Sequence, residues 1–503
     1  MGRLERNTFA NLISTVWSII LGVVSVPLYI KLMGIEAFGL VGIFLTLQSI
    51  FVIFDIGIAA TLNRETARLR SAEGGNAQKL RHLVFTLQAV YWLIALLIGA
   101  TVFALAPVIA RHWVTLQSLS VETVITCVRM MGVGMALQFP FTFYQSGLLG
   151  LEKQILLGSL MVGLATMRGL GILLALWLIL PIPEIFFAGQ IVTSIVGTGT
   201  IAILLWRCLP VSGDGATGFK FDLIRRVWRF SAAYAANAVA NLGLLHGDKI
   251  ILSTLLPLRM FGYYALAQSL TNGLYAIIIS LDGAIFPQFS GLIARGSETE
   301  LSLVYHRASQ LMSVILMPAA VMMAIFSREV LTLWTGDAEI VEHAHLILRL
   351  LVGGMLLHGL FHIPYYLQIA YGWWRLISNT NVLLLLTIIP LNILIAKSYG
   401  GAGAAAVWIL LNVCYLATVP IMHRRFLRGQ QGRWFFEDIC LPLCGALVVS
   451  LIAYWLLPQH LSRIEMMAYL SAAGLLTIVA AAALASQLRN ALLAQLRRSA
   501  NVL

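Results

Sequence analysis

Residues 83–110 read LVFTLQAVYWLIALLIGATVFALAPVIA and contain no aspartate, glutamate, lysine or arginine. A helix crosses the roughly 30 Å of hydrocarbon in a bilayer with about 20 apolar residues, so this stretch is long enough to span a membrane. Across the whole chain, 60% of the residues are hydrophobic and 11% are charged. Soluble domains are about half apolar and about a quarter charged. The composition therefore predicts an integral membrane protein.

Similar apolar stretches recur along the sequence. They predict an all-α protein of about fourteen transmembrane helices, because helices satisfy their own backbone hydrogen bonds in lipid. The expected spans lie near residues 9–31, 37–61, 83–110, 123–150, 155–180, 185–206, 230–256, 261–288, 308–327, 344–371, 376–396, 402–422, 439–457 and 466–487.

Lysine and arginine gather on one side of the expected membrane. They are concentrated near the N-terminus, in the loops 62–82, 207–229 and 423–438, and in the C-terminal tail. The positive-inside rule then predicts that both termini are cytoplasmic. Because the net charge of +12 comes largely from these short loops, we expect contact with anionic membrane lipids rather than with nucleic acid.

The loops are too short to hold a soluble catalytic domain. The chain has no glycine-rich phosphate loop, and we expect the glycines of YGGAGAAA (399–406) to form a tight turn between closely packed helices. The five scattered cysteines imply no disulfide framework. A polytopic glycosyltransferase would need paired carboxylates near the outer surface, and Asp337, Glu339 and Glu342 read as a solvated acidic turn. We therefore expect a protein that is not an enzyme and uses no cofactor.

Two stretches of the chain look like one unit used twice. The first is PLYIKLMGIEAFGLVGIF (27–44), with Asp55 further on, and the second is KIILSTLLPLRMFGYYALAQ (249–268), with Asp282 further on. Both copies are expected to run in the same direction across the membrane, which predicts two six-helix lobes in parallel orientation. The expected organisation is an N-terminal lobe (1–206), a cytoplasmic inter-lobe linker (207–229), a C-terminal lobe (230–422), and a basic loop with two further helices and a cytoplasmic tail (423–503).

The same stretches carry a family resemblance. The residues Asn7 and Asn11 precede a span that ends VPLYIKLMGIEAFGL, and FDIGI, a basic loop, GDKIILS, YYALAQ and IFPQFSGLIARG follow in order. This series resembles the Wzx-type flippases for polysaccharide repeat units, in the MOP (MATE-like) exporter superfamily. The resemblance implies two lobes around a central cavity in a bacterial inner membrane. It also implies that alternating access carries undecaprenyl-pyrophosphate-linked oligosaccharide to the outer leaflet for surface polysaccharide synthesis, with a polysaccharide polymerase and chain-length machinery as possible partners.

Charged residues inside the expected spans are candidates for the transport site, because a charge in hydrocarbon costs at least roughly 2.5–3.5 kcal/mol. Cations would stabilise the pyrophosphate of such a cargo, since guanidinium groups match phosphate oxygens and lysine acts as a point charge. The cationic candidates are Arg129, Arg168, Lys249 and Arg349. Each is also explained by a structural ion pair or by contact with a lipid headgroup.

The acidic candidates for binding a coupling proton or sodium ion are Asp55, Asp248 and Asp282, for which structural salt bridges are the alternative. Because adjacent helical residues point about 100° apart, Asp248 and Lys249 are expected to have separate partners. The spacing of His358 and His362 places both imidazoles on one helix face. We expect these rings to pack and to bond Tyr365 or Tyr366 rather than to bind a metal, since a third ligand is lacking.

The sequence therefore favours a lipid-linked oligosaccharide flippase. A multidrug or cation-coupled exporter of the same fold and a flippase for peptidoglycan precursors are the alternatives. The lining of the cavity distinguishes them, because a drug exporter should be acidic and aromatic inside whereas a carrier of a sugar phosphate should be basic and polar.

Overall fold

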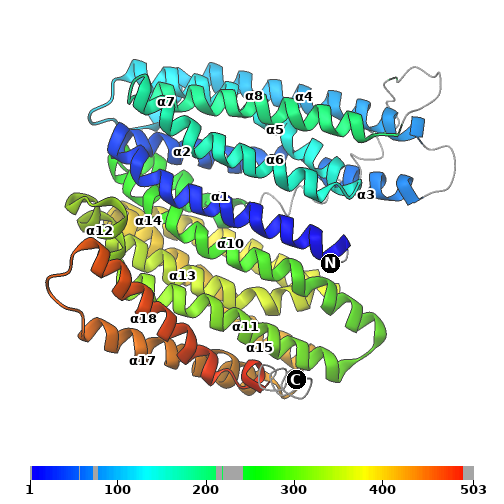
Figure 1. The fold of residues 1–503 in the computed structure, drawn as a ribbon, viewed down its shortest axis with the longest axis vertical. Coiled ribbons are helices and arrows are strands. Elements are labelled where there is room, and N and C mark those ends of the chain that lie inside the picture. Colours follow the sequence, from blue (N-terminus) through cyan, green and yellow to red (C-terminus); the bar gives the residue numbers. More distant parts are fainter. Residues whose placement is uncertain (1–2, 56, 72–76, 211–217, 219–241, 491–503) are drawn as a thin grey trace. The chain divides into compact units, whose positions relative to one another are not determined.

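A computed structural model describes residues 3–55, 57–71, 77–210, 218 and 242–490, and this part of the chain is helical, with no β-sheet (Figure 1). The predicted all-α fold is confirmed. Most of the expected linker 207–229, the beginning of the expected span 230–256 and the C-terminal tail lie outside the described residues. The chain forms two compact units, Met1–Gly262 and Tyr263–Leu503.

The first unit is a bundle of long helices with two π-helical turns. Its elements are α1 (Arg3–Met33), α2 (Ile35–Phe51), the 3-10 helix η1 (Val52–Asp55), α3 (Ile58–Ser71), α4 (Ala77–Val108), the π-helix η2 (Ile109–Trp113), α5 (Val121–Gly150), α6 (Gln154–Thr166), the π-helix η3 (Met167–Gly171), α7 (Ile172–Leu178), α8 (Pro183–Cys208) and a helical segment at 242–255. The helix α10 (Leu258–Arg295) begins in this unit and continues into the second.

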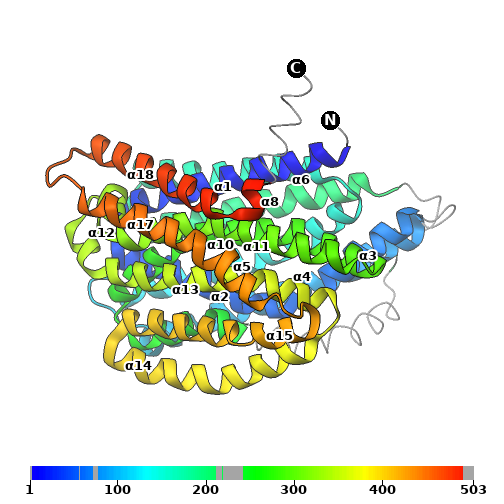
Figure 2. The ribbon, with the colours of Figure 1, turned by 90° about the horizontal axis from the view of Figure 1, so that it is seen from below.

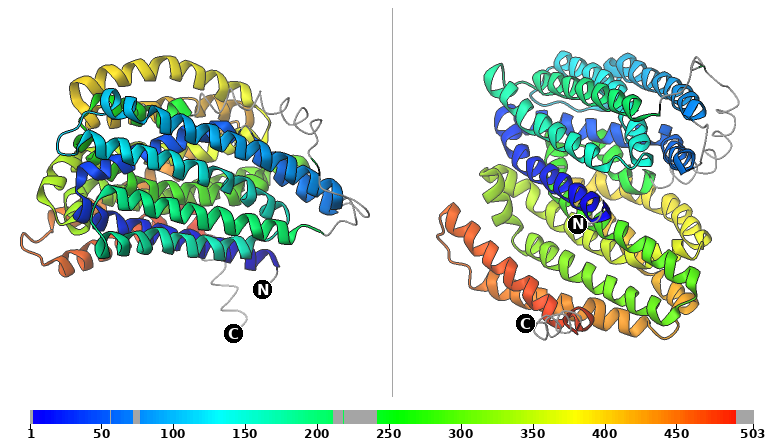
Figure 3. Two further views of the ribbon diagram at one scale, coloured as in Figure 1. Left: turned by 90° about the horizontal axis from the view of Figure 1, so that it is seen from above. Right: turned by 45° about the vertical axis from the view of Figure 1, so that its right-hand side comes forward.

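The centre of the first unit is the packing of α5 against α4 and α8, which run alongside it (Figures 1 and 3). Small residues let the helices approach closely. A β-carbon on Gly99 of α4 would lie 2.6 Å from that of Ala136 on α5. Further along, the buried rings of Tyr91, Phe143 and Tyr144 fill the space between the helices. These contacts bury the apolar faces that the sequence pattern assigns to the membrane-spanning segments.

The two copies of the repeated sequence unit meet at one end of this bundle. A β-carbon on Gly39 would lie 2.5 Å from the carbonyl oxygen of Leu258, and one on Gly262 would lie 2.4 Å from the carbonyl oxygen of Ile35. The loop between η2 and α5 forms hydrogen bonds with both copies. Its Thr115 carbonyl accepts a hydrogen bond from the amide of Leu258, at 2.9 Å. The buried carboxylate of Glu36, at the beginning of α2, accepts hydrogen bonds from the backbone amides of residues 117 and 118, at 2.7 and 2.8 Å.

The second unit contains the remainder of α10 and the helices that follow it. They are α11 (Glu298–Ile325), α12 (Ser327–Thr335), α13 (Ala338–Ala370), α14 (Trp374–Leu416), α15 (Val419–Phe426), α16 (Gln431–Arg433), the π-helix η4 (Trp434–Cys440), α17 (Leu441–Trp455) and α18 (Arg463–Leu484). The last two form an antiparallel pair (Figure 2), and α17 packs on α11.

The helix α14 doubles back on itself at Gly400, which has a left-handed φ of 58° and a ψ of −140°. After the turn, a β-carbon on Gly403 would lie 2.7 Å from the carbonyl oxygen of Ile395. This hairpin confirms the tight turn predicted for YGGAGAAA, and it separates the expected span 376–396 from the expected span 402–422, which continues beyond α14 into α15 (Figure 2).

Twelve helical stretches in the described residues are long and apolar enough to cross a membrane. One of them, 374–426, contains the hairpin at Gly400 and therefore covers two of the expected spans. The expected span 230–256 is described only at 242–255, so the described residues leave the predicted total of fourteen open.

Candidate functional site

Asp248 and Lys249 form an ion pair with each other on the segment 242–255. The ammonium of Lys249 lies 3.1 and 3.2 Å from the two carboxylate oxygens of Asp248, and it also donates to the carbonyl of Leu245 at 3.2 Å. The prediction that these neighbours do not pair with each other was wrong. Although their Cα–Cβ bonds diverge, the long lysine stem bends back along the helix, and a largely buried site favours the neutralised pair.

Arg349 of α13 binds the end of a neighbouring helix. Its Nε donates to the carbonyl oxygen of Ala324, in the last turn of α11, at 3.0 Å, and its Nη2 donates to Ser327 Oγ at 3.4 Å. The last carbonyls of a helix have no partner within it and carry partial negative charge. This contact therefore supports a structural role for Arg349.

Arg129 lies on the exposed side of the α4–α5 pair. Its guanidinium is 5.2 Å from the centre of the Phe103 ring on α4, and both side chains are exposed. A cation over an aromatic face is stabilised by the ring quadrupole, by about 0.5–1 kcal/mol at exposed sites. This contact orients Arg129 but does not neutralise it.

Arg168 lies in the π-helical turn η3, between α6 and α7, and is exposed. Within the described part of the chain, no hydrogen bond or ion pair involves its guanidinium. A π-turn leaves backbone carbonyls without their usual amide partners, and such turns are frequent at functional sites. Here the hydroxyl of Tyr29 donates to the carbonyls of Arg168 and Gly169, at 2.7 and 2.9 Å.

The backbone of this turn is fixed by α1 and α8. The Tyr29 ring meets Phe186 of α8 edge to face, at 5.1 Å between centroids. Directly before η3, the hydroxyl of Thr166 accepts a hydrogen bond from the indole of Trp17 on α1, at 2.9 Å. The arrangement thus holds one unneutralised guanidinium on a fixed, widened helical turn.

Asp55 has a local structural role at the break between α2 and α3. Its Oδ1 accepts a hydrogen bond from the amide of Ala59, in the first turn of α3, at 3.1 Å, and it also accepts a short hydrogen bond from the hydroxyl of Tyr91. A carboxylate at the beginning of a helix stabilises the free amides there. These two hydrogen bonds give the carboxylate of Asp55 a structural role inside an apolar span.

Asp282 begins a buried chain of polar side chains in the second unit. His362 Nδ1 lies 2.6 Å from Asp282 Oδ2, and the Nε2 atoms of His362 and His358 are 3.0 Å apart. His358 Nδ1 lies 2.9 Å from Asn412 Oδ1. The four side chains come from α10, α13 and α14, and all are buried. We refer to them as the Asp–His–His–Asn chain.

Two glycines of α13 let the neighbouring helices approach this chain. A β-carbon on Gly359, beside His358, would lie 2.2 Å from the side chain of Leu316 on α11 and 3.0 Å from Ile278 on α10. A β-carbon on Gly354 would lie 2.1 Å from the Trp408 ring on α14. Close packing at these positions brings carboxylate, imidazoles and amide within hydrogen-bonding distance across three helices.

The two histidines share one helix face, as their spacing predicts, and the predicted packing on Tyr365 and Tyr366 is confirmed, but the predicted hydrogen bonds to these tyrosines were wrong. All four ring nitrogens face Asp282, Asn412 or each other. Tyr365 and Tyr366 pack nearby, with ring centroids 6.1 and 6.0 Å from that of His362. The partners Asp282 and Asn412 lie on α10 and α14, far from the histidines in sequence. The residues around the histidines therefore do not reveal them, and the sequence could predict only that the two rings share one face of α13.

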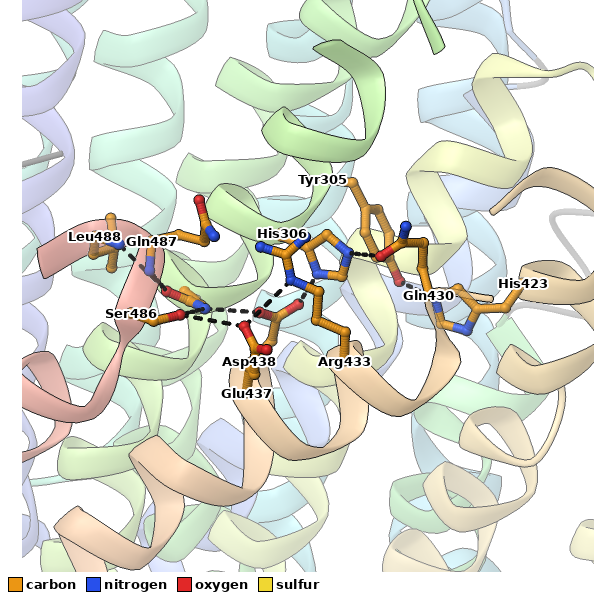
Figure 4. A network of polar contacts seen from close by, with 11 residues as sticks. Tyr305, His306, His423, Gln430, Arg433, Glu437, Asp438, Ser486, Gln487 and Leu488 are labelled. Carbon is orange, nitrogen blue, oxygen red and sulfur yellow. Dashed lines mark hydrogen bonds and ion pairs between the residues drawn. The ribbon is translucent and has the colours of Figure 1, made fainter. Parts of the chain in front are cut away.

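A second buried aspartate–histidine pair holds the last helices in place (Figure 4). His306 of α11 lies 2.5 Å from Asp438 Oδ2 in η4, and its other nitrogen lies 3.2 Å from Gln430 Oε1. Asp438 Oδ1 accepts from the amide of Gln310 at 2.9 Å, and Gln310 Oε1 accepts from the backbone amide of Gln487 at 2.8 Å. The network joins α11, η4 and the segment after α18, and sequence reasoning did not identify it.

Comparison with known proteins places the chain among transporters. A family model described as "Polysaccharide biosynthesis protein" matches residues 4–293, more than half of the chain, and the MatE model matches residues 248–394. A putative O-antigen transporter of Shigella flexneri is 21% identical over 221 residues, which are 44% of this chain and 51% of the relative. The match thus spans about half the length of that relative.

Solved structures share the fold. The lipid II flippase MurJ, in an inward closed conformation, has a TM-score of 0.70 at 12% identity, over 95% of this chain and 98% of that one. An inward-facing multidrug resistance MATE family transporter of the MOP superfamily has a TM-score of 0.64 at 12% identity, over 83% of this chain and 98% of that one. The family resemblance predicted from the sequence is confirmed. The chain is a multi-pass membrane protein with the MOP transporter fold, and it belongs to the polysaccharide biosynthesis protein family.

Proposed function

We propose that the protein is a flippase that moves undecaprenyl-pyrophosphate-linked oligosaccharide repeat units from the inner to the outer leaflet of a bacterial inner membrane. It works by alternating access, with both termini cytoplasmic, and carries out no covalent chemistry. The isoprenoid chain stays in the lipid while the pyrophosphate and the sugars pass through the protein.

Arg168 is the observation that carries this proposal. Its guanidinium has no acidic partner in the described residues, and its backbone is fixed by Tyr29. A free guanidinium offers a planar fork of donors that matches two phosphate oxygens, and it is less strongly hydrated than an ammonium group. An anionic headgroup that leaves water would therefore be stabilised at this position.

The three acidic candidates favour the same cargo, because each already has a partner. Asp55 accepts from Ala59 and Tyr91, Asp248 pairs with Lys249, and Asp282 pairs with His362. A cation exporter would need unneutralised acids for its cargo. The match to the MatE model and the likeness to a multidrug transporter nevertheless keep that exporter as the second candidate.

The contact between the two repeat copies supports alternating access. Gly39 packs against the carbonyl and side chain of Leu258, and Gly262 packs against the carbonyl and side chain of Ile35, so the two copies meet through a small, mostly apolar surface. With the termini inside, this contact lies at the outer end of the bundle. Such a contact can separate and re-form as a unit when the outer side opens.

Cargo selectivity tests the proposal. The purified protein in lipid nanodiscs would be titrated with an undecaprenyl-pyrophosphate oligosaccharide, a peptidoglycan lipid precursor and a lipophilic organic cation, with the thermal unfolding midpoint as the readout. We expect the pyrophosphate-linked oligosaccharide to stabilise the native protein and to do so less in Arg168→Ala. Stabilisation by the organic cation alone would favour the exporter, and preference for the peptidoglycan precursor would favour the third alternative.

A further inference from the structure

The Asp–His–His–Asn chain contains three consecutive links, and each link needs one hydrogen. The links are Asp282 to His362, His362 to His358, and His358 to Asn412, with heavy-atom distances of 2.6, 3.0 and 2.9 Å. Atoms this close are attractive only when one hydrogen lies between them. Two bare nitrogens, or a bare nitrogen and a carboxylate oxygen, repel each other at these distances.

The direction of the hydrogen bonds is set at the asparagine end. The side-chain nitrogen of Asn412 donates to the carbonyl oxygen of Trp408 at 2.8 Å, so its Oδ1 must face His358. An amide oxygen only accepts, and His358 Nδ1 therefore carries a hydrogen. A neutral His358 then has a bare Nε2, which accepts from the Nε2–H of His362.

The hydrogens do not balance when Asp282 is ionised and both histidines are neutral. That state supplies two ring hydrogens for three links, and one link is left without a hydrogen in whichever tautomers the rings adopt. One further proton, shared between Asp282 Oδ2 and His362 Nδ1, completes the chain. It also removes the net negative charge of a buried cluster, which is costly to keep in an apolar environment.

Among the described residues, no lysine or arginine forms an ion pair with a member of this chain. The titratable groups that pack around the chain are tyrosines on two helices, Tyr275 on α10 and Tyr365 and Tyr366 on α13. Within the described residues, Asp282 Oδ1 is buried and has no hydrogen-bond partner. This oxygen receives no hydrogen bond that would stabilise a negative charge on it.

The Asp438–His306 pair differs from this chain at its carboxylate. Both oxygens of Asp438 accept hydrogen bonds, and both nitrogens of His306 face oxygen atoms. Asp438 therefore has no oxygen without a hydrogen bond, whereas Asp282 has one. The two buried aspartates thus differ in their hydrogen bonding, and Asp438 serves as the comparison.

We propose that the Asp–His–His–Asn chain is a binding site for one exchangeable proton, and that its loading and release couple cargo movement to the downhill entry of protons. The coupling step rests on the proposed flippase function, whereas the proton site does not. Release of the proton removes the hydrogen bond between Asp282 on α10 and His362 on α13. Loss of this bond weakens the packing of these helices, so they can rearrange when the site is empty.

Infrared difference spectroscopy between acidic and alkaline pH tests the site without any cargo. The full-length protein in lipid is expected to show a titrating carboxyl or imidazole signal that is lost in both Asp282→Asn and His362→Gln and is kept in Asp438→Asn. Gel filtration and the unfolding midpoint check that each variant is folded. An unchanged difference spectrum in both Asp282→Asn and His362→Gln would overturn the proton site.

Proteoliposomes with an imposed pH gradient test the coupling. A gradient that is acidic on the outer side should accelerate movement of fluorescent lipid-linked oligosaccharide by the native protein and by Asp438→Asn. It should leave the rate of His362→Gln unchanged, while exchange without a gradient persists in that variant. Equal acceleration in His362→Gln would refute the coupling. If the native protein moves no such cargo, the flippase proposal fails, and the infrared result still decides the proton site.

Discussion

Gly39 and Gly262 occupy equivalent positions in the two copies of one sequence unit, and each packs against the carbonyl oxygen of the residue four positions before the other. The approach distances of a β-carbon, 2.5 Å at Gly39 and 2.4 Å at Gly262, are nearly equal. The contact is therefore reciprocal, as expected where two copies of a unit meet about a local twofold axis. Both glycines are required by the space available, since no β-carbon fits this close to a carbonyl oxygen.

Replacement of either glycine should open this contact. In Gly262→Ala, the new β-carbon displaces the carbonyl of Ile35, and overpacking of this kind costs roughly 1–3 kcal/mol. We expect faster hydrogen–deuterium exchange in peptides that cover residues 33–40 and 114–120. Gly22→Ala is the control, because its β-carbon would meet nothing within 4 Å. Equal exchange in Gly262→Ala and Gly22→Ala would show that the contact does not hold this end closed.

Loss of the Arg168 guanidinium should weaken cargo binding. A hydrogen bond to a charged group contributes roughly 1.5–3 kcal/mol, so we expect Arg168→Ala to bind lipid-linked pyrophosphate on the order of ten- to a hundredfold less tightly. Arg168→Lys should retain part of the affinity, because it keeps the charge but loses the fork of donors. Titration of nanodiscs with fluorescent cargo measures this. Arg129→Ala is the control, because Arg129 is also an exposed arginine within a span. An equal loss of cargo affinity in Arg129→Ala would show that Arg168 has no special role in binding.

The Asp248–Lys249 pair should be energetically coupled. Residues in direct contact commonly show coupling energies of roughly 0.5–3 kcal/mol in double-mutant cycles. We expect Lys249→Met to lower the unfolding midpoint and to do so much less in an Asp248→Asn background. Thermal unfolding of the two single variants and the double variant gives the coupling. Additive effects would mean that the ion pair contributes nothing to stability.

Disruption of the Asp438–His306 pair should loosen the C-terminal helices. Removal of one partner leaves the other buried polar group without its hydrogen bond, which costs roughly 1–3 kcal/mol, so His306→Gln is expected to expose the region from η4 onward to limited proteolysis. Arg463→Gln, at the far end of the α17–α18 pair, serves as the control. Unchanged cleavage in His306→Gln would show that apolar packing alone holds α17 and α18.

The hydropathy of the sequence accounts for the all-α fold and for most span positions, because each span satisfies its backbone internally and needs no distant partner. The hairpin at Gly400 was also predictable, since three close glycines between apolar runs permit a tight turn. The partners of His358, His362 and Arg349 were not predictable. They depend on how α10, α11 and α14 pack against α13, which no local pattern encodes.

The charged candidates also show that the sequence identifies residues of interest but not their partners. Burial costs identified Asp282, Arg168 and Lys249 as residues that need an explanation, but the explanation differs for each. Lys249 is neutralised by its neighbour, and Asp282 belongs to a chain across three helices. Asp438 was passed over because it lies at the edge of an apolar run, although the structure buries it completely.

Leaflet-to-leaflet movement tests the account most directly. Purified protein would be reconstituted in liposomes that contain fluorescent undecaprenyl-pyrophosphate oligosaccharide, and a membrane-impermeant quencher would report the cargo in the accessible leaflet. We predict that the native protein equilibrates the cargo between leaflets and that Arg168→Ala, folded and equally reconstituted, does so much more slowly. No movement by the native protein beyond that in empty liposomes, or equal rates in the two proteins, would contradict the account.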